Sequence, residues 1–64
     1  MRIRELRADL GLSQKELAYK VGVTPAYMCG LENGTKKNPS LMLLVRIAKE
    51  LNVTVTDLLE QRAS

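Results

Sequence analysis

Glycines and helix-capping residues divide the chain into short segments, each with the apolar spacing of an α-helix. Residues 3–10 carry apolar side chains at i, i+3 and i+7, and Gly11 is expected to stop this first helix. Ser13 and Glu16 have the spacing of a capping box, in which each side chain accepts a hydrogen bond from the other's backbone N–H. They predict the start of a second helix, which Gly22 ends.

The middle of the chain carries two more start signals. Thr24 is expected to cap a third helix with Pro25 at its first position, where the missing N–H costs nothing, and Gly34 follows its end. After a polar, basic loop, Ser40 is expected to cap a fourth helix over residues 41–51. Both helices are therefore predicted with defined starts.

The C-terminal part predicts one last short helix, which Thr54 or Thr56 caps and which carries Leu58 and Leu59. Alternation of the β-strand kind is nowhere sustained. The interpretation is a compact, all-α fold of five helices, forming a single domain over residues 1–64.

The size and composition of the chain restrict its chemistry. A domain of 64 residues is marginally stable alone. With one cysteine, Cys29, and no histidine, the chain cannot form an internal disulfide and lacks the usual metal ligand. It also shows no phosphate loop and no catalytic carboxylate pair. We therefore expect no cofactor and no enzymatic activity, with stability coming from helix packing or a second copy.

The charge suits an anionic partner, because the formal net charge is +3. The longest apolar run, residues 41–45, is far too short to cross a bilayer, and the first residues lack the apolar stretch of a signal peptide. The expected location is the cytoplasm, with no membrane association.

The third helix has two different faces. Met28 lies on an apolar face that can pack on the second helix, whereas Ala26, Gly30 and Asn33 fall on the opposite side, expected to be open to solvent. A glycine inside a helix costs roughly 1 kcal/mol relative to alanine. Gly30 is therefore either adapted to a close approach or merely tolerated.

An ordered set of short motifs resembles the lambda-repressor-like helix-turn-helix family, also called the Cro/C1 or XRE type. The resemblance covers roughly residues 3–59, and its motifs are Ser13-Gln14-Lys15-Glu16-Leu17-Ala18, Gly22-Val23-Thr24, Leu31-Glu32-Asn33-Gly34, Asn38-Pro39-Ser40-Leu41 and Ile47-Ala48. It implies a transcriptional regulator, in the role of a repressor, that binds double-stranded DNA in a sequence-specific manner. The helix-turn-helix proper would span about 13–33, with helix 24–33 in the major groove.

The resemblance also implies roles for single residues. Gln14 would touch the DNA backbone or a base, and the loop after the third helix would grip phosphate. Arg7 would form an ion pair with Glu32, which explains a carboxylate beside a DNA-binding surface. Family members carry Gln, Arg or Lys at base-reading positions where this chain has Ala26 and Gly30, so readout is expected to rely on neighbouring residues and DNA shape. The candidate DNA contacts are Gln14, Thr24, Pro25, Ala26, Tyr27, Gly30, Asn33, Lys36, Lys37 and Asn38.

A homodimer on a palindromic operator is the assembly that the resemblance implies. Its expected contacts are Val53, Val55 and Leu58, with Met42 or Leu43 as extensions, although some of these could instead close the core. The alternative function is an antitoxin or another protein-interaction module with the same fold.

Overall fold

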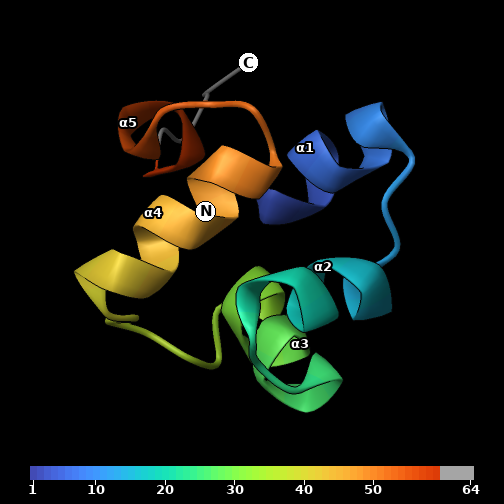
Figure 1. The fold of residues 1–64 in the computed structure, drawn as a ribbon. Coiled ribbons are helices and arrows are strands. Elements are labelled where there is room, and N and C mark those ends of the chain that lie inside the picture. Colours follow the sequence, from blue (N-terminus) through green and yellow to red (C-terminus); the bar gives the residue numbers. More distant parts are fainter. Residues whose placement is uncertain (60–64) are drawn as a thin grey trace.

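The computed structural model describes residues 1–59, and all of their regular secondary structure is helical (Figure 1). The five helices are α1 (Ile3–Leu10), α2 (Gln14–Val21), α3 (Pro25–Asn33), α4 (Leu41–Glu50) and α5 (Val55–Leu59). The all-α, five-helix fold expected from the sequence is confirmed. The predicted single domain also includes residues 60–64, which lie outside the described part.

The starts of α2 to α5 form where hydroxyl or carboxylate side chains satisfy free backbone N–H groups, whereas α1 has no side-chain cap. At α2, Ser13 Oγ accepts from Glu16 N–H at 3.0 Å, and Glu16 Oε1 accepts from Ser13 N–H at 2.9 Å. The hydrogen bond from the Ser13 backbone N–H, followed by the contribution of the Ser13 hydroxyl, lowers the pKa of the Glu16 carboxyl. At α3 and α4 only the hydroxyl of Thr24 or Ser40 caps the helix, whereas Thr54 and Asp57 form a reciprocal pair at α5, as at α2.

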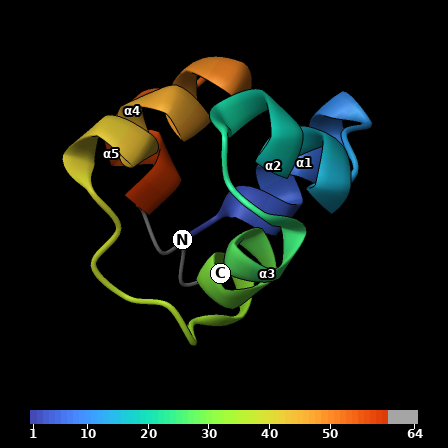
Figure 2. The same ribbon diagram turned by 60° about the horizontal axis from the view of Figure 1, so that its bottom comes forward.

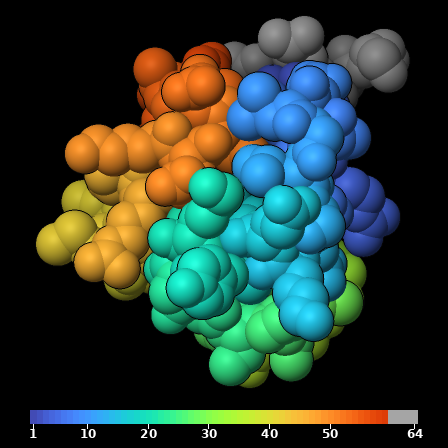
Figure 3. Space-filling model, turned by 45° about the vertical axis from the view of Figure 1, so that its right-hand side comes forward, coloured from blue at the N-terminus to red at the C-terminus, as the bar shows by residue number. Residues whose placement is uncertain are grey.

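Helix α2 lies at the centre of the packing. It contacts α1, α3 and α4, and α4 also contacts α5. The space-filling view shows α2 at the front, between α1 and α4, with α3 below it (Figure 3). One core joins the elements, and its fully buried large side chains are Ile3, Leu17, Val21, Met28, Leu31, Ile47 and Leu58.

The N-terminal end of the chain is tied to α5, because the Arg2 backbone N–H donates to the Leu58 carbonyl at 3.0 Å. Two leucines at helix ends lie outside the core. Leu10 is 45% exposed at the end of α1, and Leu41 is 71% exposed at the start of α4. The apolar stripe predicted for residues 3–10 is therefore shorter than its spacing suggested. Within residues 1–59, no helix has the length and apolar character needed to cross a membrane.

Candidate nucleic-acid interface

Helices α2 and α3 are joined by a tight turn. Gly22 has a φ of 80°, in the left-handed region that favours glycine, and the Val23 N–H returns to the Ala18 carbonyl at 3.0 Å. Thr24 then starts α3, which lies across α2 (Figure 2). The turn thus fixes the direction of α3 relative to α2.

Helix α3 buries one face and exposes another. Met28 and Leu31 have 0% and 2% exposure in the core. The exposed residues at the start and on the outer face are Thr24, Pro25, Ala26, Cys29 and Asn33, and Tyr27 is half-buried. The outer face at the helix start therefore carries small or uncharged side chains, as the sequence indicated.

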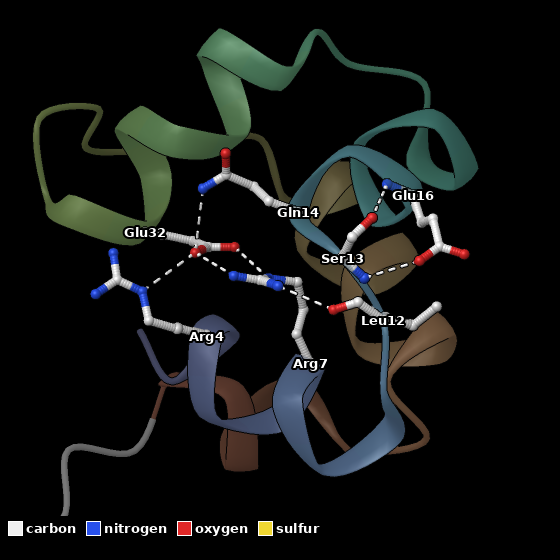
Figure 4. A network of polar contacts seen from close by, with 7 residues as sticks. All are labelled: Arg4, Arg7, Leu12, Ser13, Gln14, Glu16 and Glu32. Carbon is white, nitrogen blue, oxygen red and sulfur yellow. Dashed lines mark hydrogen bonds and ion pairs between the residues drawn. The ribbon is translucent and has the colours of Figure 1, made fainter.

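The single carboxylate of α3 is enclosed by cationic and amide groups from α1 and α2 (Figure 4). Arg7 Nε donates to Glu32 Oε2 at 2.7 Å, and Arg7 Nη2 donates to Oε1 at 3.0 Å, a bidentate pair. The Glu32 side chain has 0% exposure and that of Arg7 has 14%. Arg7 Nη1 also donates to the Leu12 carbonyl at 2.9 Å, which fixes the guanidinium in place.

Two more side chains complete this group, which we call the Glu32 network: Arg4, Arg7, Gln14 and Glu32. Gln14 Nε2 donates to Glu32 Oε1 at 3.3 Å. Arg4 Nε lies 3.5 Å from the same oxygen, although the Arg4 side chain is 70% exposed. Sequence reasoning missed Arg4, whose only signal is that it precedes Arg7 by three residues and so shares a face of α1.

The network keeps Glu32 charged. Burial by itself raises the pKa of Glu32, but the hydrogen bonds from Arg7 and Gln14, the charge of Arg7 and the contact with Arg4 outweigh it. The pKa of Glu32 is lowered as a result, and the hydrogen bond to Glu32 raises the pKa of Arg7. The negative charge of α3 is thereby neutralised inside the protein, and the amide of Gln14 is already engaged at the start of α2.

Gly30 is not on an open face, so the expectation of solvent exposure is wrong. It is buried, and a Cβ at this position would meet Lys36 Cγ at 2.6 Å. The Lys36 backbone N–H also donates to the Gly30 carbonyl at 3.0 Å. The physical reason is that the loop after α3 folds back, and its lysine occupies the space that a side chain on α3 would take.

The other predicted contacts of this region lie at the end of α3 and in the loop that follows. Asn33 is exposed, but its Oδ1 accepts from the Thr35 backbone N–H at 2.9 Å, so its carbonyl shapes the turn. Lys37 and Asn38 are exposed, and Asn38 has a φ of 58°. The structure therefore brings the loop beside α3 while leaving Lys37 and Asn38 at the surface.

The predicted dimer contacts do not form one exposed surface. Leu58 has 0% exposure, so its expected place at an interface is wrong. It belongs to the core because α5 packs on α4 and the Leu58 carbonyl is bound by the Arg2 N–H. Val53 and Val55 are half-buried against the same core. Met42 is 68% exposed, and Leu43 is half-buried beside a hollow of about 520 Å³.

Comparisons with known proteins decide the family. A family model described as "Helix-turn-helix" matches residues 3–58. An HTH-type transcriptional regulator of Archaeoglobus fulgidus is 51% identical over 57 residues, which cover 89% of this chain and 80% of that protein. The chain belongs to the helix-turn-helix family.

Solved structures of this helix-turn-helix family have the same fold. The structure of the biofilm regulator SinR in complex with DNA is similar with a TM-score of 0.85 and 37% identity, covering 92% of this chain and 94% of that one. The SinR protein of Bacillus subtilis is 36% identical over 61 residues, which cover 95% of this chain. The chain spans 55% of the length of that SinR protein.

Proposed function

We propose that this helix-turn-helix protein binds double-stranded DNA and regulates transcription, in the role of a repressor. The observation that carries the proposal is the state of α3, whose single carboxylate is buried in the Glu32 network while its outer face is exposed. A free carboxylate there would repel phosphate. The similarity to SinR, whose structure was solved with DNA, also supports DNA binding by this protein.

In the proposed complex α3 enters the major groove and the start of α2 faces the backbone. The exposed residues Thr24, Pro25 and Ala26 stand at the N-terminal end of α3, which is the end that approaches base edges. Free N–H groups at the start of α2 favour a phosphate, and Gln14 stands beside them. Lys37 and Asn38 are exposed candidates for the neighbouring phosphates.

A homodimer on a palindromic operator is the assembly that we propose, with half-sites about 34 Å apart on one face of the duplex. Val53 and Val55 remain candidate contacts because part of each side chain is accessible. The proposed location is the cytoplasm, where the DNA is within reach. The antitoxin alternative is not favoured, because the relatives compared above are transcriptional regulators.

Binding is tested by fluorescence anisotropy with a labelled duplex of random sequence at low salt, followed by selection of preferred sites from random DNA. We expect binding that weakens as salt rises. The logarithm of the association constant should fall with the logarithm of the salt concentration, with a slope of about −0.9 per phosphate contacted. Selection should then yield a two-fold symmetric site. Absence of binding at low salt would contradict the function. Sedimentation of the protein on the selected site tests the dimer, and one protomer per site at saturation would exclude it.

A further inference from the structure

The outer face of α3 lacks the side chains that discriminate bases best. Arginine or lysine on guanine, and asparagine or glutamine on adenine, make the bidentate contacts of direct readout. Helix α3 contains no lysine, arginine or glutamine, and its one asparagine uses its Oδ1 in the turn after the helix. Helix α3 offers the Tyr27 hydroxyl and the Asn33 amide as weaker donors, but a lysine or arginine donor to guanine must come from outside it.

The loop supplies such a donor at the right place. The side chain of Lys36 crosses α3 at Gly30, where its Cγ occupies the space that a Cβ would need. Its Nζ lies 6.0 Å from the centre of the Tyr27 ring, one helical turn closer to the start of α3. The lysine stem therefore leads from Gly30 to the ring of Tyr27, a residue in the first turn of α3, and its ammonium lies beside that ring.

Two interactions hold this arrangement. The Lys36 backbone N–H donates to the Gly30 carbonyl at 3.0 Å, which fixes the origin of the side chain. The ammonium over the Tyr27 ring gains a weak cation–π attraction, which favours this position of its end. Lys36 is still an exposed residue, so the ammonium is available to a ligand.

We infer that Lys36 is a base-reading residue of the recognition surface, with guanine as its target, and that Gly30 is the positioning residue that allows it. This inference rests on the proposed function. It gives Lys36 and Lys37 different roles, although the sequence predicts that both lysines of this loop contact phosphate. Lys37 makes no hydrogen bond, ion pair or cation–π contact within residues 1–59.

The experiment compares four proteins on a site selected by the wild type from random DNA, on every single-base-pair variant of that site, and on unrelated duplex. Lys36→Met keeps the stem over Gly30 and removes the ammonium. Lys37→Met removes a charge from the same loop and is the matched control. Gly30→Ala keeps every charge but places a Cβ against Lys36 Cγ. Circular dichroism and the urea midpoint check that each variant is folded.

We expect Lys36→Met to weaken binding to the selected site by about 5- to 150-fold and to erase the preference at one G·C pair, since that is the range of one bidentate contact. Gly30→Ala should relax the preference at the same pair without a change in salt slope, because no charge is lost. Lys37→Met should weaken binding to all duplexes alike.

Three results distinguish the failures. A wild type that binds no duplex at low salt overturns the proposed function and this inference with it. If the wild type binds but Lys36→Met and Lys37→Met both weaken all duplexes equally, Lys36 is a phosphate contact and the inference is wrong. If Lys36→Met relaxes one position but folded Gly30→Ala does not, Gly30 has no positioning role. Should Gly30→Ala fail to fold, the two lysine variants still decide whether Lys36 reads a base.

Discussion

Glu32 and Gly30 lie two residues apart on α3, and the chain covers them in different ways. Glu32 is enclosed by side chains from α1 and α2, and its carboxylate has no exposure. Gly30 is covered by one flexible lysine from a loop that remains at the surface. The Glu32 network should therefore control the stability of the fold. Gly30 and the Lys36 side chain over it, which we call the Gly30 side, should control what α3 presents to a ligand.

The largest effect is expected from Glu32→Ala, which leaves Arg7 charged and part-buried without its partner. Loss of one member of a buried pair costs roughly 3–5 kcal/mol, a large share of the stability of so small a domain. The urea midpoint measures the loss, and Glu32→Gln provides a folded variant if Glu32→Ala unfolds. Glu50→Ala, at an exposed position of α4, is the matched control. Equal midpoints for Glu32→Ala and Glu50→Ala would show that the network does not stabilise the fold.

The two arginines of the Glu32 network should differ strongly. Arg7→Met is expected to cost roughly 3 kcal/mol, because it leaves the Glu32 carboxylate buried without its bidentate partner. Arg4→Met should cost less than about 1 kcal/mol, since Arg4 is mostly exposed and its contact is 3.5 Å long. Chemical denaturation of both variants checks the ranking. If Arg4→Met loses more unfolding free energy than Arg7→Met, then Arg4 and not Arg7 is the main partner of Glu32, and this ranking is wrong.

Acid should weaken the fold through the Glu32 network, and also through Glu16, whose pKa is likewise lowered. The pKa of Glu32 is lowered in the folded state from its ordinary value of 4.5, so the unfolded chain binds its proton first as the pH falls. The contribution of Glu32 is therefore fully present above about pH 4.5 and is lost as the pH falls through the folded pKa. The difference in unfolding free energy between wild type and Glu32→Gln should shrink below pH 4.5. A difference that stays constant from neutral pH to pH 3 would contradict the lowered pKa.

The smallest effect on stability is expected on the Gly30 side. Lys36→Met should change the free energy of unfolding by less than about 0.5 kcal/mol, because it keeps the stem and removes only an exposed ammonium. Thermal unfolding beside the wild type measures this change. A loss comparable to that of Glu32→Ala would mean that the cation–π contact with Tyr27 is structural, and the comparison between the two sides would fail.

Local signals were enough to predict most of the fold. Ser13, Thr24 and Ser40 start helices where the sequence places them, since capping depends on residues only three positions apart. Leu58 was misplaced because α5 has only five residues, too few for periodicity to show which face is buried. Which face of so short a helix is buried depends on the elements that pack against it.

The candidate site was harder to predict, because its contacts join distant parts of the chain. The pairing of Arg7 with Glu32 followed from the family resemblance and not from spacing, since the two residues lie 25 positions apart. The cover over Gly30 depends on the path of the loop, and a mid-helix glycine indicates only that something can approach closely. Sequence reasoning therefore found the glycine but not the lysine that fills its place.

The most direct test of the central claim, that α3 and its flanking segments form a DNA-binding surface, is an NMR titration. ¹⁵N-labelled protein is mixed with a duplex selected from random DNA, and backbone amide shifts are followed residue by residue. The expected shifts lie at the start of α2, at residues 24–30 of α3 and at Lys36 and Lys37, with little change through α1. Shifts confined to α5 and residues 53–55, or none at saturating duplex, would contradict the claim.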